Sequence, residues 1–202
     1  MDNSAHSTHT VGSLGVDNKK LGMWTFIGSE VMLFTSLIAT YLTFRGEAKV
    51  KIPPFAHDLL SDPVSSAIVA ANTLVLLCSS LTMVLALDGA ERGNRRKFFT
   101  FILATATLGA LFLSVQIFEY SKLIGEGLSL SANQFGASFF TLTGFHGLHV
   151  AIGVFLLLYT ALRGRVQGFT REFPLGVELI GLYWHFVDLV WVVIFMIVYL
   201  LR

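Results

Sequence analysis

Five long apolar runs, separated by charged or turn-forming segments, dominate the pattern of hydrophobic and polar positions along the chain. They cover residues 21–44, 66–87, 98–123, 135–162 and 177–201. Each run reaches the length of about 20 residues that a helix needs to cross the hydrocarbon core of a bilayer. The runs are apolar on all faces, whereas the helices of a soluble bundle carry a polar stripe. The pattern predicts an all-α integral membrane protein, a bundle of five transmembrane helices.

The breaks between the runs are rich in proline, glycine and charged residues, which end helices and form turns. Residues 1–20 are rich in Ser, Thr, His and Asn and lack the apolar core of a cleaved signal peptide. We therefore expect a polar, flexible segment at 1–20 and a transmembrane domain at 21–202. Lys and Arg gather on the side of the N-terminus, above all at 92–97 and 163–171. This bias predicts a cytoplasmic N-terminus and an external C-terminus.

Composition and charge agree with a membrane protein. Hydrophobic residues make up 54% of the 202 positions and charged residues 13%, where a soluble domain has about 25% charged residues. Lys and Arg number 14 against 13 Asp and Glu, so no basic excess points to a nucleic-acid partner. The single cysteine, Cys78, excludes an internal disulfide and any site that needs two thiolates.

Ionisable residues inside the apolar runs are the candidate functional residues, because each costs about 3 kcal/mol or more at the bilayer centre. They are Glu30, Glu119, His146, His149, Glu178, His185 and Asp188. Counting the helical rise places Glu30, His146, His149, His185 and Asp188 at a similar depth, so we expect them to share one polar layer. Glu119 falls near the external end of its helix and Glu178 near the cytoplasmic end.

Two pairs in this set are three residues apart, which puts each pair on one helix face. His146 and His149 form one pair, and His185 and Asp188 form the other. The spacing suits metal ligands, but the two Glu-x-x-His segments of the usual dimetal bundle site are absent. Interhelical hydrogen bonding is the favoured interpretation, with contacts from His146 to Glu30 or Asp188 expected. Lipid headgroup binding and proton relay remain alternatives.

Three further features concern packing and the membrane surface. Small residues along the fourth run, including Gly136, Gly144, Gly147 and Gly153, predict close approach of neighbouring helices. Trp184 and Trp191 lie too deep for an interfacial belt and are expected to face protein. The basic cluster that begins at Arg92 is typical of a positive-inside anchor, which also suits anionic lipid headgroups.

The polar motifs of all five runs resemble subunit III of the haem-copper respiratory oxidases, in its five-helix bacterial form. The matching positions include Gly28-Ser29-Glu30-Val31, Asn72-Thr73, Gln116, Glu119-Tyr120, Gly144-Phe145-His146-Gly147-Leu148-His149-Val150, Glu178, Tyr183-Trp184-His185-Phe186-Val187-Asp188 and Trp191. The motifs of the fourth and fifth runs are the most specific. Longer family members have two additional helices that this chain lacks.

The resemblance implies a non-catalytic subunit in the bacterial cytoplasmic membrane, docked on oxidase subunit I, with subunits II and IV and a larger respiratory assembly as further partners. Haem and copper are then expected in the partner subunits, with no redox metal in this chain. Glu30 matches the carbodiimide-reactive carboxylate of the family, which supports proton uptake. Phospholipid binding is implied for Glu30, His146, His149 and Arg92.

The leading hypothesis is therefore subunit III of a proton-pumping cytochrome c oxidase, which reduces oxygen to water. A quinol oxidase subunit III and an accessory protein of a nitric oxide reductase are alternatives with the same fold. From other classes, an independent proton channel or transporter would predict inverted repeats and broken helices, and neither is visible in the sequence. A metal-dependent membrane enzyme would predict bound metal in the purified chain.

Overall fold

Five long helices form the computed structural model of the protein, which describes residues 17–47, 63–125, 127–131, 133–166, 168–170 and 173–200. The helices are α1 (Asn18–Glu47), α3 (Pro63–Glu91), α4 (Arg95–Gly125), α5 (Gln134–Val166) and α6 (Phe173–Phe195), and α6 continues as a π-helix, η1 (Met196–Leu200). All five long helices have the length and apolar composition that a membrane span requires. The predicted five-helix membrane bundle is confirmed.

Most helices extend beyond the apolar runs that predicted them, because polar residues cap their first turns. The Asp17 carboxylate accepts a hydrogen bond from the Lys19 backbone N–H at 2.8 Å, so α1 begins at Asn18. The side chains of Asn94 and Asn133 cap α4 and α5 in the same way. The polar segment expected at 1–20 thus overlaps α1, and its first 16 residues lie outside the described residues.

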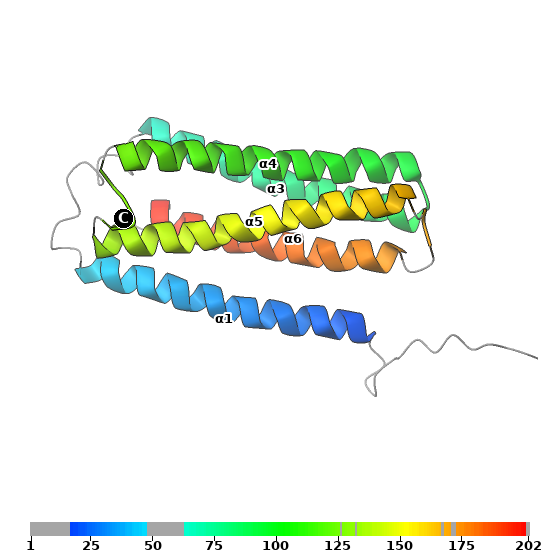
Figure 1. Ribbon diagram of the computed structural model, residues 1–202, viewed down its shortest axis with the longest axis horizontal. Helices are drawn as coiled ribbons and strands as arrows, with labels where there is room; N and C mark the ends of the chain where they lie inside the picture. The colour runs from blue at the N-terminus through cyan, green and yellow to red at the C-terminus, as the bar shows by residue number, and fades with distance from the viewer. Residues whose placement is uncertain are drawn as a thin grey trace, which may run out of the picture.

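The helices α3, α4, α5 and α6 form an antiparallel four-helix unit, and α1 lies on its outside (Figure 1). In this unit α3 packs on α4 and α6, while α5 packs on α4 and α6. Helix α1 packs on α5 and α6. Only 6% of the most apolar stretch of α1 is buried, against 50% in α6, so α1 leaves most of its surface to lipid or partner proteins.

A tight turn joins α3 to α4 and fixes them as neighbours. Gly93 adopts a φ of 67°, a conformation that glycine tolerates best. The backbone N–H of Gly93 donates to the Ala90 carbonyl, and that of Asn94 donates to the Gly89 carbonyl, which completes a Schellman motif. Because Asn94 also caps α4, the two helices are joined with almost no loop.

Trp184 of α6 is the largest side chain in the core and is fully buried. It lies between two glycines: a Cβ at Gly109 of α4 would be 2.5 Å from the indole, and one at Gly153 of α5 would be 2.8 Å from it. Gly153 therefore makes the close approach that the small residues of α5 predict. The indole N–H donates to Ser79 Oγ of α3 at 2.9 Å, so Trp184 contacts all three other helices of the unit.

Candidate functional site

Among the described residues, polar contacts connect α1 to the rest of the molecule near each end and in the middle. They include Lys20 Nζ to Glu178 Oε1 at 2.7 Å, Glu30 Oε2 to His149 Nε2 at 2.9 Å, and Arg45 Nη1 to the Ile197 carbonyl at 2.6 Å. Apolar packing of α1 on the other helices centres on two large buried side chains, Phe34 and Tyr41. The middle contact is the one that joins two ionisable groups deep within the helical span.

The Glu30–His149 pair is largely buried but keeps some surface exposure. The side chains retain 16% and 12% of their exposure, so the pair can be reached from the outer surface of α1 and α5. The Phe34 ring packs edge-on against the imidazole, with ring centroids 5.1 Å apart. The Tyr183 hydroxyl donates to the backbone carbonyl of His149 at 3.0 Å and ties the same turn of α5 to α6.

The hydrogen bonds of His149 determine what the pair can do chemically. Its Nδ1 lies 2.7 Å from the Phe145 carbonyl, which can only accept, so Nδ1 carries a proton. The contact between Nε2 and Glu30 Oε2 then needs one further proton between the two atoms. The pair is either imidazolium and carboxylate or imidazole and carboxylic acid. In both forms it holds one transferable proton in the middle of the membrane span.

His146 lies apart from this pair and points into the four-helix unit. It is fully buried between two aromatic rings. The imidazole centroid lies 5.8 Å from the centroid of the Phe112 ring and 4.7 Å from that of the Trp191 ring. Its Nε2 contacts the Val187 carbonyl of α6 at 3.2 Å. The expected contact of His146 with Glu30 is wrong, because His149 is the partner of Glu30.

His185 and Asp188 form a third group, between α6 and α3. His185 Nδ1 lies 2.6 Å from Ser80 Oγ, and the Asp188 carboxyl group lies near the same hydroxyl. Asp188 is 3% exposed, and neither carboxyl oxygen has a hydrogen-bond partner among the described residues. The expected His146–Asp188 contact is therefore also not found.

The single polar layer predicted from depth is thus three separate groups at a similar depth. Residues three apart on a helix differ in direction by about 60°. Since α5 has α1, α4 and α6 as neighbours, that difference sends His149 to α1 and His146 toward α4 and α6. Depth can be counted from the sequence, but direction depends on which helices are adjacent.

The remaining predicted site residues lie closer to the helix ends or in the core. Gln116 Nε2 donates to the Tyr120 hydroxyl and to the Thr143 carbonyl, and Tyr120 donates to Thr143 Oγ1. Trp191 Nε1 donates to Thr73 Oγ1, so both deep tryptophans face protein, as predicted. Near the turn between α3 and α4, Asp88 pairs with Arg92 and with Lys97, away from the histidines.

Several family-motif residues also have defined surroundings. Asn72 is buried and donates to the Phe112 carbonyl at 3.3 Å. Gly147 lies against Gln116, whose Oε1 would be 3.1 Å from an added Cβ, and Gly144 faces the Tyr120 hydroxyl. Glu119 remains partly exposed beside Lys122, consistent with its predicted place near the end of its helix.

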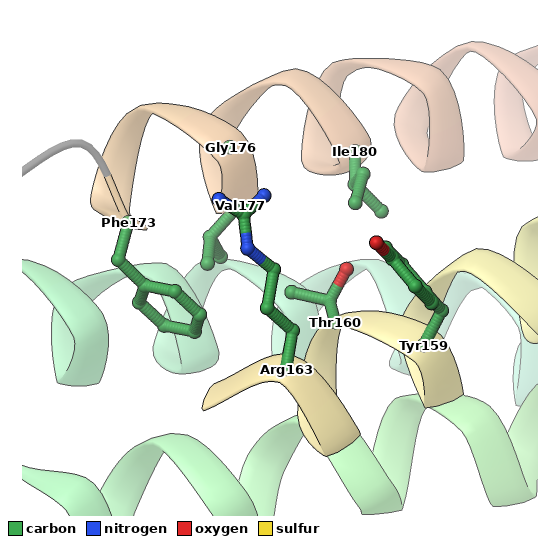
Figure 2. Close-up of a pocket in the computed structure, with 7 residues that line it drawn as sticks. All are labelled: Tyr159, Thr160, Arg163, Phe173, Gly176, Val177 and Ile180. Carbon is green, nitrogen blue, oxygen red and sulfur yellow. The ribbon is translucent and has the colours of Figure 1, made fainter. Parts of the chain in front are cut away.

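A pocket between α5 and the start of α6 was not predicted from the sequence (Figure 2). It is lined by Tyr159, Thr160, Arg163, Phe173, Gly176, Val177 and Ile180. Arg163 extends from the last turns of α5 toward the first turns of α6, beside apolar side chains (Figure 2). The sequence feature that could have indicated this pocket is Arg163, a basic residue close to two hydroxyl side chains at the end of an apolar run. Nothing in the sequence placed α6 opposite them.

The described His, Cys, Asp and Glu side chains are not arranged as the ligands of a metal ion. Across the described part of the chain, no group of three His, Cys, Asp or Glu side chains is arranged to hold a metal ion. The histidines instead contact a carboxylate, backbone carbonyls and a serine hydroxyl. Hydrogen bonding between helices is the interpretation that fits these contacts.

Comparison with known proteins identifies the family. Residues 2–202 match the family described as cytochrome c oxidase subunit III. The chain belongs to this family. Cytochrome c oxidase subunit 3 of Bacillus sp. (strain PS3) is 39% identical over 184 residues, which cover 91% of this chain and 86% of the relative. Probable cytochrome c oxidase subunit 3 of Nocardia farcinica is 35% identical over 203 residues, covering 96% and 94%.

Subunit III relatives carry two kinds of name. Quinol oxidase subunit 3 of Bacillus subtilis (strain 168) is 34% identical over 182 residues, which cover 90% of this chain and 86% of the relative. The family as a whole therefore includes subunits of both oxidase types. Membership implies association with other oxidase subunits in an oxidoreductase complex. The five helices and the bacterial relatives make this subunit III a multi-pass bacterial membrane protein.

Proposed function

We propose that this chain is subunit III of a proton-pumping cytochrome c oxidase, an accessory subunit without a redox centre. It packs on subunit I, whose haems and copper reduce oxygen, with subunits II and IV as further partners. Its N-terminus faces the cytoplasm and its C-terminus the outside of the bacterial cytoplasmic membrane. The observation that carries the proposal is the Glu30–His149 pair, a proton-holding group at mid-span in a chain of this family.

The outer surface of the helices supports a subunit role. Large apolar side chains remain exposed on α1, among them Trp24 at 59% and Met32 at 76%. Similar side chains are exposed on α3, α4 and α5, for example Leu81, Phe118 and Phe155. Lipid tails and the apolar core of a permanent subunit interface both suit such surfaces.

The proton of the Glu30–His149 pair provides the mechanism for supporting proton uptake. The Glu30–His149 pair can gain or lose one proton. The hydrogen bond from Nδ1 to the Phe145 carbonyl holds the imidazole ring in place during this exchange. Because the pair keeps partial exposure, water or a partner group can exchange a proton with it. The same exposure makes Glu30 the expected target of a hydrophobic carbodiimide, which reacts with a protonated carboxyl group.

Carbodiimide labelling tests this role directly. We expect Glu30→Gln to abolish labelling of this chain in the purified complex while its haem content is unchanged. Glu178→Gln is the matched control. Glu178 of α6 is also paired with a basic residue, Lys20 of α1, but it lies near the end of the span. Labelling that persists unchanged in Glu30→Gln would contradict the assignment, and its loss in Glu178→Gln would move the assignment to Glu178.

The pocket at Arg163 is proposed to bind a phospholipid headgroup. The Arg163 guanidinium and the Tyr159 hydroxyl lie beside apolar side chains, the combination that suits a phosphate with acyl chains attached. Arg163→Ala should lower the amount of phospholipid that copurifies with the complex, measured by native mass spectrometry. Arg165→Ala, which changes a neighbouring exposed arginine outside the pocket, should leave it unchanged. Equal lipid content in both variants would argue against the pocket.

Affinity purification in mild detergent tests the whole proposal. We expect haem and copper to copurify with this chain and a large subunit, and reduced cytochrome c to be oxidised by the preparation. Quinol oxidation without cytochrome c oxidation would instead establish the quinol oxidase alternative, the type named for one of the Bacillus subtilis relatives. A chain that purifies alone would refute the accessory role.

A further inference from the structure

Four side chains in the interior of the four-helix unit have hydrogen-bonding atoms without a partner among the described residues. They are Asn72 Oδ1, Gln116 Oε1, His146 Nδ1 and both carboxyl oxygens of Asp188. The residues are 5%, 6%, 0% and 3% exposed, so solvent at the surface does not reach them. Leaving a buried polar atom without a hydrogen bond destabilises the folded state, so four such side chains need a physical explanation.

Each helix of the unit contributes one of these side chains, and we call the part of the interior that they occupy the polar level. The amide of Asn72 on α3 bonds to the Phe112 carbonyl on α4, and the Phe112 ring packs against His146 on α5. Gln116 follows Phe112 by one helical turn and bonds to the carbonyl of Thr143, one turn before His146. His146 bonds to the Val187 carbonyl on α6, and Asp188 is the next residue along α6.

The existing hydrogen bonds show what kind of atom is left over. The amide nitrogens of Asn72 and Gln116 donate to backbone carbonyls, so their free atoms are the oxygens. His146 Nε2 contacts a carbonyl and must carry the ring proton, which leaves Nδ1 with a lone pair. Asp188 offers acceptors as a carboxylate and only one donor as a carboxylic acid. The level therefore has an excess of acceptors and lacks donors.

We propose that this level of the four-helix unit binds ordered water. A water molecule supplies two donors, and buried water in proteins commonly makes about three hydrogen bonds to otherwise unpaired polar groups. Water donating to His146 Nδ1, to the amide oxygens of Gln116 and Asn72, and to Asp188 would satisfy the excess acceptors. The interior of α3–α6 is then hydrated, and this site is distinct from the Glu30–His149 pair on α1 and α5.

The neutral ligand is favoured over a cation by the residues present. In the described chain no three His, Cys, Asp or Glu side chains converge as metal ligands. The level offers one carboxyl group and three neutral side chains, and their free atoms come from four different helices. A water molecule supplies hydrogen-bond donors, and it does not require several ligands to converge on one point.

A density map of the full chain, in the assembly with which it purifies and at a resolution that shows ordered water, tests the proposal. We expect peaks at hydrogen-bond distances of about 2.7–3.2 Å from at least two of the four side chains. Direct hydrogen bonds among the four, with no intervening peak, would overturn it. A peak with several oxygen ligands at about 2.0–2.6 Å would identify a cation and overturn it as well.

A pair of histidine variants sharpens the result. His146→Leu removes the Nδ1 acceptor and should abolish the peak beside it, while His185→Leu should leave that peak in place, because His185 Nδ1 bonds to Ser80 instead. Peaks unchanged in His146→Leu would contradict the role of this histidine. If His146→Leu does not assemble, the map of the unaltered chain decides the question by itself.

Discussion

Replacing Glu30 by Gln tests whether the central contact of α1 is stronger than the contact near its end. The Glu30–His149 pair is 2.9 Å long with side chains 16% and 12% exposed, whereas the Lys20–Glu178 pair has side chains 36% and 34% exposed. A hydrogen bond to a charged group at a shielded site contributes about 1.5–3 kcal/mol, and an exposed ion pair about 0–1 kcal/mol. We therefore expect Glu30→Gln to cost about 2 kcal/mol and Glu178→Gln less than 1 kcal/mol.

The free energy of unfolding in mixed detergent micelles, followed by circular dichroism, measures both costs. A difference of about 1.4 kcal/mol between the two variants is about tenfold in the unfolding equilibrium constant, well within reach of the assay. A double-mutant cycle with His149→Gln should give a coupling of about 1 kcal/mol, because only the unaltered pair joins two groups that can both carry a charge. Equal costs for the two glutamate variants, or an additive double variant, would refute the reasoning.

Three further predictions concern packing and turns. Gly109→Ala should destabilise the chain by about 1–3 kcal/mol, because its Cβ would lie 2.5 Å from Trp184. Gly22→Ala, with nothing within 4 Å, should be neutral or slightly stabilising, and equal unfolding free energies would contradict the close packing of Trp184 on Gly109. Gly93→Ala should cost about 1 kcal/mol because of its positive φ, measured by the same unfolding assay. Trp191→Phe should cost about 1 kcal/mol through the lost bond to Thr73, and a neutral result would show that this bond adds nothing.

The fold was largely predictable because a membrane imposes a simple rule on sequence. Each span needs about 20 apolar residues, and the five runs meet that need without ambiguity. The helix ends were less predictable, since capping residues such as Asp17 and Asn94 are polar and lie outside the runs. The adjacency of the helices was not predictable, because helices that are apolar on all faces carry no pattern that selects neighbours.

The candidate site was predictable in its residues and depth but not in its pairing. Counting residues placed Glu30, His146 and His149 at one level, and in the structure Glu30 contacts His149 while His146 belongs to a separate group. Which histidine meets Glu30 depends on the rotation of α5 between α1 and the other helices, a property of three-dimensional packing. The pocket at Arg163 was missed for the same reason, since four of its seven lining residues come from α6.

The position of α1 follows from its polar contacts more than from its apolar surface. Lipid tails are as apolar as leucine, so burying side chains such as Met32 against protein yields little net free energy inside a membrane. Polar groups differ, because lipid cannot replace a lost hydrogen-bond partner. Contacts at Lys20, Glu30 and Arg45 occur at three depths along α1, and together they fix both its height and its rotation. The proton-holding Glu30–His149 pair is therefore also the central attachment of α1, and a change in its proton count alters the contact that holds this helix on the four-helix unit.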